Sequence, residues 1–206
     1  MTNKDMLLPT GVFGLDTVLG GGLSRPSLVA IIGAPGAGKT VLASQILFHA
    51  ARRGLKTIIF TSFSEGVEQY IQHMQPLEFF DTAMVGDAVQ VFTLASQIRT
   101  EDASPDTAIA RTIRASGAKV VLLDGFQSVE AQLPADRSVR ALLSALATQI
   151  RYLDATVLVT IAGDARDAQF HTEMTIADAA IALRYRVQGR RHERLVEIVK
   201  LRGRAQ

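Results

Sequence analysis

The sequence predicts an α/β fold in which a mostly parallel central sheet is covered by helices and ends in an antiparallel pair of strands. Three observations support this prediction. Short apolar runs typical of buried strands alternate with segments of helical periodicity along most of the chain. A glycine-rich loop at residues 33–40 joins one strand to the next helix. Near the C-terminus, two strand-like segments follow each other with a short polar stretch between them, which is typical of a hairpin.

The glycine-rich loop is the strongest functional signal. Residues 33–40 read Gly-Ala-Pro-Gly-Ala-Gly-Lys-Thr, which matches the phosphate-binding pattern G-x-x-x-x-G-K-[ST] between the apolar strand 27–32 and a helical segment. Glycines let backbone N–H groups curl around a phosphate, and the dipole of the next helix favours the same anion. The predicted nucleotide-binding residues are Gly33, Ala34, Pro35, Gly36, Ala37, Gly38, Lys39, Thr40 and Val41. The charge of Lys39 is expected at the β- and γ-phosphates, where it also serves catalysis, and the hydroxyl of Thr40 is expected on Mg²⁺.

The next strand leads to the candidate catalytic groups. Residues 57–61 form an apolar run that predicts a second buried strand. Ser64 and Glu65 follow it, at the strand end where ligands bind in open α/β sheets. Further along, we expect a short helix at 67–74, a weaker strand at 89–92 and a helix at 103–115 with Ser104 as its N-cap.

A second metal-binding signal lies at residues 119–124, where four consecutive apolar residues end in Asp124. In phosphate-loop proteins a buried strand with this ending places its carboxylate at Mg²⁺. Many strands end in aspartate, so the prediction depends on the phosphate loop earlier in the chain. A helix at 138–153 and a strand at 156–161 follow. Thr160, near the end of that strand, is a candidate for sensing the γ-phosphate, and a buried core threonine is the alternative.

The two ends of the chain carry less specific signals. Residues 163–173 form a polar loop, and the strands predicted at 176–185 and 195–201 make a hairpin around 188–191. At the other end, residues 9–23 are rich in glycine but too apolar for a flexible leader. We therefore expect this segment to pack on the rest of the chain through Val12, Phe13, Leu15, Val18 and Leu19.

Composition limits the class of protein. The 206 residues suit one domain, spanning 1–206, and the absence of cysteine excludes disulfides and thiolate metal sites. The four histidines have no metal-ligand spacing. No signal peptide or membrane-spanning run is visible, so a cytoplasmic location without a membrane partner is expected. The net charge of +2 hides an asymmetry, because residues 184–206 carry +6 and the remainder −4.

With these motifs in place, the chain resembles the RecA-like ATPases of the KaiC and RadA type. Four blocks support the resemblance, in the same order and spacing over nearly the whole chain: residues 10–16 with 19–23, the phosphate loop, the strand end 63–65, and residues 197–203. The chain looks most like a single KaiC ATPase domain, the N-terminal half. The resemblance implies a RecA-like P-loop NTPase core that binds ATP and Mg²⁺. It also implies a homo-oligomeric ring, usually hexameric, with ATP between subunits.

The resemblance also assigns the catalytic groups. Lys200 and Arg202 would point at the γ-phosphate bound by a neighbouring subunit, and positions i and i+2 of a strand do share one face. The family commonly has two adjacent glutamates after the second strand, the first acting on the attacking water. Here Ser64 stands in the first place, and Glu65 remains. We predict that Glu65 acts on the water, that Ser64 orients it, and that hydrolysis is slow.

We therefore predict a KaiC-like ring ATPase acting as a regulatory or clock-type signalling module, with two alternatives open. A RadA-like accessory would bind DNA, yet the loop 163–173 sets three acidic residues against one arginine, which disfavours nucleic acid. Salt-dependent binding to single-stranded DNA would separate the two. A nucleotide-sensing scaffold would show little turnover, and phosphate release over hours would identify it.

Overall fold

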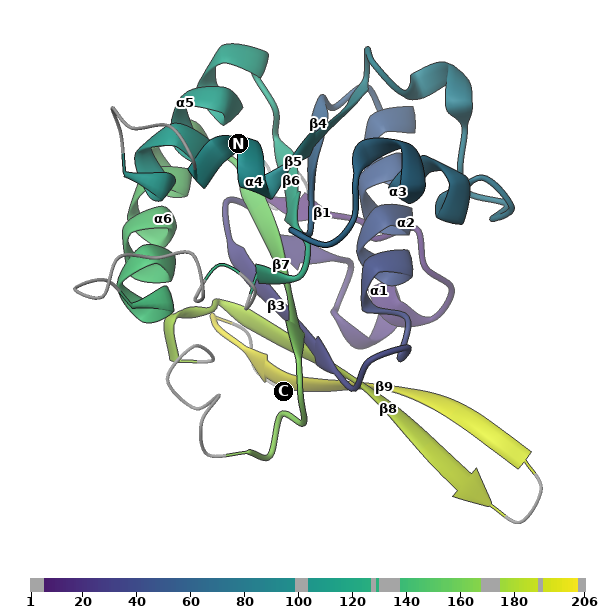
Figure 1. Cartoon of the computed structure of the whole chain (residues 1–206). Coiled ribbons are helices and arrows are strands. Elements are labelled where there is room, and N and C mark those ends of the chain that lie inside the picture. The colour runs from purple at the N-terminus through teal and green to yellow at the C-terminus, as the bar shows by residue number, and fades with distance from the viewer. Residues whose placement is uncertain are drawn as a thin grey trace.

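The computed structural model describes residues 6–98, 104–126, 129, 138–167, 175–188 and 191–203. Its centre is a seven-stranded sheet with the strand order β5-β4-β6-β7-β3-β8-β9. Neighbouring strands from β5 to β8 are parallel, and β9 pairs antiparallel with β8 at one edge, which confirms the predicted fold class (Figure 1). The strands are β3 (Leu28–Gly33), β4 (Thr57–Thr61), β5 (Val89–Thr93), β6 (Val120–Leu123), β7 (Thr156–Ala162), β8 (Ala179–Gln188) and β9 (Arg191–Leu201).

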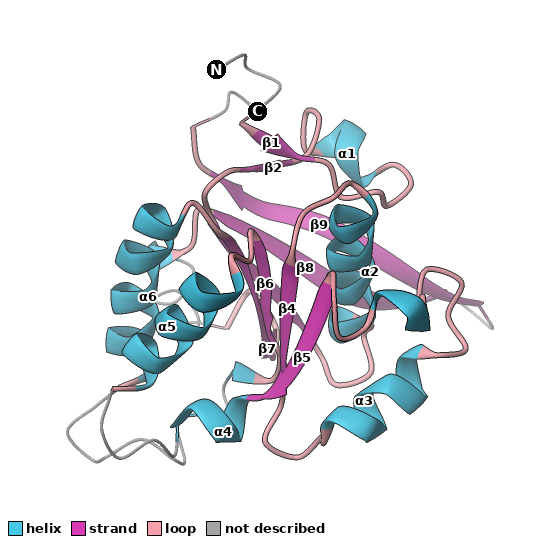
Figure 2. Cartoon of the chain, turned by 90° about the horizontal axis from the view of Figure 1, so that it is seen from above, coloured by secondary structure: helices cyan, strands magenta, loops and turns pink. Residues whose placement is uncertain are grey.

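Helices cover both faces of this sheet (Figure 2). On one face lie α5 (Pro105–Ser116) and α6 (Val139–Leu153), and on the other lie α2 (Lys39–Arg52) and α3 (Val67–Met74). The strands β3, β4 and β6 are buried along their whole length, as expected for parallel strands covered on both sides. The shorter elements are β1 (Leu7–Leu8), α1 (Leu15–Val18), β2 (Leu23–Ser24), η1 (Thr82–Met84) and α4 (Leu94–Ile98).

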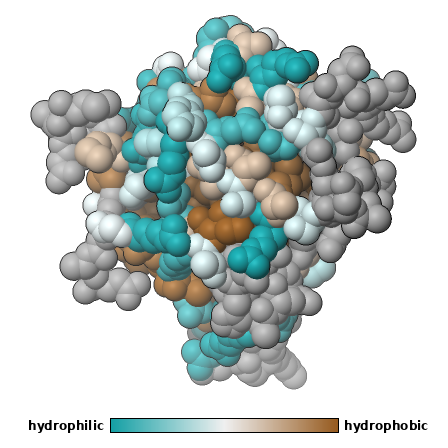
Figure 3. Space-filling view, turned by 90° about the vertical axis from the view of Figure 1, so that its left-hand side faces the viewer, coloured by the Kyte–Doolittle hydropathy of each residue, from teal (hydrophilic) through white to brown (hydrophobic). Residues whose placement is uncertain are grey.

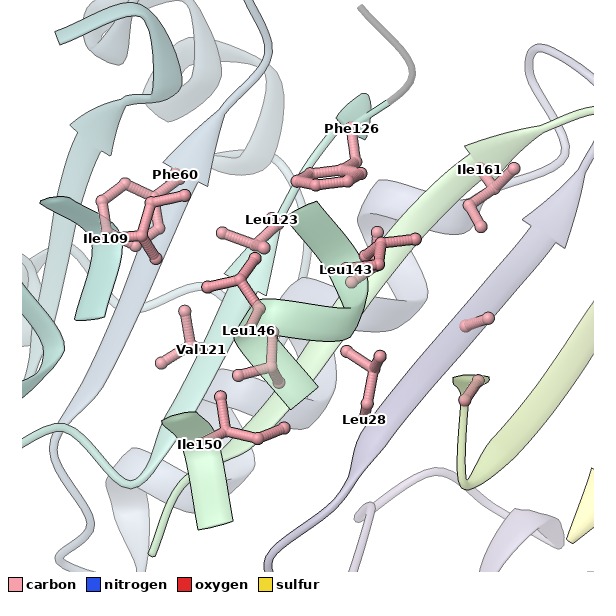
Figure 4. Close-up of a cluster of buried hydrophobic side chains, with 14 of the residues drawn as sticks. Leu28, Phe60, Ile109, Val121, Leu123, Phe126, Leu143, Leu146, Ile150 and Ile161 are labelled. Atoms are coloured by element: carbon pink, nitrogen blue, oxygen red, sulfur yellow. The ribbon is translucent and has the colours of Figure 1, made fainter. Parts of the chain in front are cut away.

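Each face of the sheet has its own hydrophobic cluster. Under α6, Leu146 and Ile150 lie beside Val121 and Leu123 of β6 (Figure 4). These helical side chains recur at the spacing of one helix face, so they meet the sheet together. The side of the molecule that carries α5 and α6 presents hydrophilic side chains to solvent, with hydrophobic areas between them (Figure 3).

The parallel register brings the functional loops to one edge of the sheet. Gly33, the last residue of β3, pairs with Ala162 of β7 and Leu183 of β8. The loops that follow β3, β4 and β6 therefore leave the sheet on the same side. Since the nucleotide and metal groups were all predicted on these loops, the topology can gather them at one place.

The segment 9–23 packs on the chain only in part. Leu15 and Leu19 are buried and Val12 is partly buried against the same cluster, as expected. The prediction is wrong for Phe13 and Val18, whose exposed fractions are 105% and 67%. Val18 lies in α1, which has four residues and can turn a single side toward the core, whereas Phe13 precedes this helix.

The remaining predicted elements agree with the structure except at their ends. The segments 57–61 and 67–74 have the predicted bounds, whereas β8 and β9 extend further toward the hairpin tip than expected. Residue 103 and most of the loop 163–173 lie outside the described residues. Among the helices that the structure describes, none has both the length and the apolar character to cross a bilayer. The cytoplasmic location stays a prediction.

Candidate functional site

The phosphate loop has the backbone shape that its glycines allow. It begins where β3 ends at Gly33 and finishes where α2 begins at Lys39. Gly36 and Gly38 have φ angles of 78° and 95°, in the left-handed region that favours glycine. A Cβ on Gly33 would lie 2.6 Å from the carbonyl oxygen of Leu183, so this position also excludes side chains. The start of the loop at Gly33 is thus packed closely against β8.

Lys39 folds back over its own loop. Its ammonium donates hydrogen bonds to the carbonyl oxygens of Gly33 at 2.8 Å and Ala34 at 3.0 Å. Burial lowers the pKa of Lys39, while the negative charge of Asp124 acts in the opposite direction. The one cationic side chain of the loop therefore lies within the electrostatic reach of the predicted metal-binding carboxylate.

Thr40 and Asp124, predicted separately as Mg²⁺ ligands, are in direct contact. The hydroxyl of Thr40 donates to Asp124 Oδ1 at 2.9 Å across 84 residues of sequence, and lies 3.1 Å from Oδ2. Asp124 is 5% exposed at the end of β6. One hydroxyl and one carboxylate form the protein share of a Mg²⁺ site, since this ion usually takes its other ligands from phosphates and water. The residues present therefore fit the metal that the loop implies.

Thr160 contacts the same carboxylate oxygen as Thr40. Its hydroxyl donates to Asp124 Oδ1 at 2.6 Å and accepts from the backbone N–H of Gly125 at 2.7 Å. The residue is 1% exposed. This geometry favours the alternative of a buried core threonine that orients Asp124. Contact between Thr160 and the γ-phosphate stays a prediction.

Ser64 and Glu65 lie in a tight turn after β4. The hydroxyl of Thr61 donates to the carbonyl oxygen of Glu65 at 2.7 Å, and the N–H of Glu65 donates to the carbonyl of Ser62. The hydroxyls of Ser62 and Ser64 are 3.2 Å apart. The carboxylate of Glu65 contacts His73 Nδ1 of α3 at 2.7 Å. The sequence analysis gave His73 no role. Glu65 lies in a turn and His73 near the end of the next helix, and no sequence pattern predicts contact between residues at this spacing.

Tyr70 is a second residue that the sequence analysis missed. It is fully buried between α3 and α2, and its hydroxyl donates to Ser44 Oγ at 2.8 Å. Burial raises the pKa of the Tyr70 phenol, and the charges of Asp124 and Glu65 act in the same direction. The hydrogen bond to Ser44 opposes this rise, and it links α3 to the helix that follows the phosphate loop.

A cavity of about 740 Å³ opens beside the first half of the phosphate loop. Its walls come from Gly33–Pro35, from the residues after β7 and from β8. Arg184 is held in this wall by Asp164 at 3.0 Å and Glu197 at 2.7 Å. Tyr185, the next residue of β8, donates its hydroxyl to the carbonyl oxygen of Gly36. The volume falls within the range of small-molecule sites.

Lys200 and Arg202 lie at the other end of the sheet from the loop. Both donate to the carbonyl oxygen of Thr175, at 3.0 and 2.6 Å, so the predicted common direction of the two side chains is observed. Burial lowers the pKa of Lys200, and the charge of Arg202 adds to this effect, while Asp178 opposes it. Arg202 also lines a second cavity of about 490 Å³ with residues of α6. The structure of this one chain does not bring the pair to the phosphate loop.

Comparisons with known proteins agree with this arrangement. The KaiC ATPase family model matches residues 8–206. The chain is 29% identical to the circadian clock oscillator protein KaiC of Picosynechococcus and 28% identical to that of Thermosynechococcus vestitus, over 94% and 95% of its length. It spans about 40% of the length of these relatives. A KaiC-like protein of the archaeon Pyrococcus horikoshii has a similar structure, with a TM-score of 0.78 and 21% identity over 96% of this chain and 89% of that one.

Proposed function

The chain belongs to the KaiC family of ATPases, and from this premise we propose that it binds ATP with Mg²⁺ on residues 33–41 and hydrolyses it slowly as a subunit of a ring. The observation that supports this proposal most is the contact between Thr40 and Asp124, which follow β3 and β6. Two motifs that are 84 residues apart meet at one buried point beside the phosphate loop. A structural aspartate would not require the hydroxyl of this particular threonine.

In this proposal different residues bind different parts of ATP and its Mg²⁺. Backbone N–H groups of Gly33–Val41 surround the phosphates, and Lys39 exchanges its carbonyl partners for phosphate oxygens. Thr40 and Asp124 hold Mg²⁺, which supplies charge neutralisation at the phosphates, and Thr160 keeps Asp124 in position. The cavity beside Gly33–Pro35 offers room for the rest of the nucleotide.

The residue proposed to act on the attacking water is Glu65. It follows β4, beside β6 in the sheet, so its turn leaves the same edge as the loop of Asp124. Ser64 in the neighbouring position can orient a water but is a poor proton acceptor at neutral pH. Turnover is therefore expected to be slow. Glu65→Gln should lower turnover about 10²- to 10⁴-fold while ATP still binds, the range for losing a positioned base.

The ring is proposed because Lys200 and Arg202 lie away from the loop of their own subunit. The KaiC resemblance assigns them to the γ-phosphate held by the next subunit. A guanidinium suits the spread charge of a phosphoryl group in transfer. We infer that the ring acts as a regulatory module, in line with the clock oscillator relatives. DNA is not among the proposed partners.

The direct test measures mass and phosphate release on the same protein. With ATP and Mg²⁺, we expect a particle several times the mass of one chain, and slow phosphate release that stops when Mg²⁺ is chelated. A ring with bound ATP and no release over hours would replace this proposal by a nucleotide-sensing scaffold. Salt-sensitive binding of single-stranded DNA would favour the RadA-like alternative.

A further inference from the structure

Glu65, the residue proposed to act on the attacking water, is in contact with His73 of α3. Glu65 Oε1 and His73 Nδ1 are 2.7 Å apart, and the residue before Glu65 is Ser64. The side chain of Glu65 is 17% exposed, and that of His73 is 57% exposed. A pair with one partner so open to water contributes little to stability.

The helix that carries His73 is attached to the helix that follows the phosphate loop. Its neighbours Tyr70 and Met74 are the buried residues of α3. Tyr70 donates to Ser44 of α2, the helix that begins at Lys39. The turn that carries Glu65 is fixed independently by Thr61. The imidazole is carried by α3, which is attached to α2 through Tyr70, and the carboxylate is carried by the turn that Thr61 stabilises. Both attachments lie near the end of the sheet where the phosphate loop is.

We propose that His73 is a positioning residue that holds the carboxylate of Glu65 in the orientation needed to act on the attacking water. This inference rests on the proposed function, in which Glu65 takes that role. An N–H at Nδ1 donates to Oε1 and stops rotation of the carboxylate. The other carboxylate oxygen is then the one that meets the water. A fixed hydrogen bond of this kind keeps a general base within reach of its proton, which a freely rotating glutamate does only part of the time.

Two substitutions of nearly equal size separate the hydrogen bond from the packing. His73→Asn keeps an N–H donor near the position of Nδ1, and His73→Leu removes it. Gln72→Leu, at the exposed neighbouring position of α3, is the matched control. For ATP hydrolysis we expect kcat to fall about tenfold in His73→Leu with KM unchanged. In His73→Asn it should stay within about threefold of the wild type, and in Gln72→Leu it should not change, because a positioning effect is a fraction of what the base itself supplies.

The double variant Glu65→Gln with His73→Leu tests whether His73 acts through Glu65. If it does, the double variant is no slower than Glu65→Gln alone. Additive losses, an unchanged kcat in His73→Leu, or an Asn variant as slow as the Leu variant would each overturn the positioning role. Wild-type turnover in Glu65→Gln would instead overturn the assignment of the base, and with it this inference.

The contact is also open to a measurement that needs no turnover. In the nuclear magnetic resonance spectrum of the whole chain, Glu65→Gln should shift the imidazole nitrogen resonances of His73 and leave those of His49 in place. Unmoved His73 resonances would overturn the contact without touching the proposed ATPase activity. A wild-type protein that released no phosphate, with His73 still shifted by Glu65→Gln, would overturn the proposed function and the positioning role while leaving the contact.

Discussion

The two ends of the sheet differ in how their polar groups are satisfied. At the loop end, Asp124 is buried and accepts hydrogen bonds from Thr40 and Thr160, which come from different elements of the chain. At the other end, Lys200 and Arg202 share one backbone carbonyl, and Arg202 is half exposed beside a cavity. Both groups have partners within the chain, but the carboxylate of Asp124 is buried, whereas the side chain of Arg202 is half exposed and also lies near Asp178.

The distance between the two ends follows from the register of β3. Arg202 donates its backbone N–H to Asp178, and Asp178 accepts from the N–H of Leu28, at the start of this strand. The strand β3 runs six residues from Leu28 to Gly33, which is about 16 Å in extended conformation. In the proposed ring, Lys200 and Arg202 of one subunit would reach the phosphate loop of the next, so the two ends would meet across an interface. Variants at each end of the sheet test whether the two ends act in different subunits.

Lys39→Ala should abolish ATP binding by the chain that carries it. The loop would lose its cationic side chain, which the structure places over the carbonyls of Gly33 and Ala34. Calorimetric titration with ATP measures the effect, and Lys56→Ala, an exposed lysine before β4, is the control. Unchanged affinity in Lys39→Ala would remove residues 33–40 from the binding site.

Arg202→Ala should leave ATP binding intact and lower hydrolysis by a factor of about 10³ or more, the range seen when an arginine finger is lost. Arg140→Ala, on the exposed face of α6, is the control. Phosphate release and ATP affinity are measured on the same preparations. Equal losses of affinity and turnover would mean that Arg202 supports the fold instead of the reaction.

Mixing variants tests directly whether the two ends act in different subunits. Rings that contain both Arg202→Ala and Lys39→Ala chains should recover part of the activity, because some interfaces then pair an intact loop with an intact arginine. Native mass spectrometry establishes that mixed rings form. If such rings are as inactive as each variant alone, Arg202 does not act across an interface.

Asp124→Asn should lower Mg²⁺-dependent hydrolysis by about 10²-fold or more and reduce ATP affinity less. The carboxylate would hold the metal that stabilises the negative charge developing during phosphoryl transfer. The amide keeps the size of the side chain and one acceptor oxygen for Thr40 and Thr160. Asp87→Asn, at an exposed position, is the control. Hydrolysis at a series of Mg²⁺ concentrations measures the difference. Equal loss of binding and hydrolysis would make Asp124 a structural residue.

The sequence was most informative where a pattern is local. The phosphate loop and the strand ending at Asp124 could be identified because each is a continuous run whose residue types are set by the backbone or by the buried strand. No single segment of the sequence predicts the order of β6, β7 and β3 in the sheet. This order brings Thr160 against Asp124. The same holds for His73, since its partner lies across a turn.

Exposure was harder to predict than secondary structure. Phe13 and Val18 are apolar, and the sequence offered no reason to leave them in water. Which side of a four-residue helix faces the core depends on the path of the chain before and after it. Single exposed apolar residues are common on protein surfaces, so their presence does not alter the fold prediction.

The hairpin β8–β9 contacts the phosphate loop and also carries Lys200. One of its residues, Tyr185, donates to the carbonyl oxygen of Gly36 in the phosphate loop, from 149 residues further along the chain. The ring of Tyr185 also lies under the guanidinium of Arg194 of β9, 5.9 Å from the ring centre. The strand that carries Lys200 is therefore connected through two side-chain contacts to the phosphate loop of the same chain.

Tyr185→Phe should have the smallest of these effects. It removes one hydrogen bond to the outer side of the loop and keeps the ring under Arg194. A hydrogen bond is worth about 0.5–1.5 kcal/mol net, so ATP affinity should weaken about two- to tenfold. Turnover at saturating ATP should stay within about twofold, since the hydroxyl braces the loop and does not meet the γ-phosphate. Calorimetric titration of ATP into Tyr185→Phe, with Tyr152→Phe on the exposed side of α6 as the control, measures the shift. A loss as large as that of Lys39→Ala would make Tyr185 part of the binding site itself, whereas no loss would mean that the hairpin and the loop meet without supporting each other.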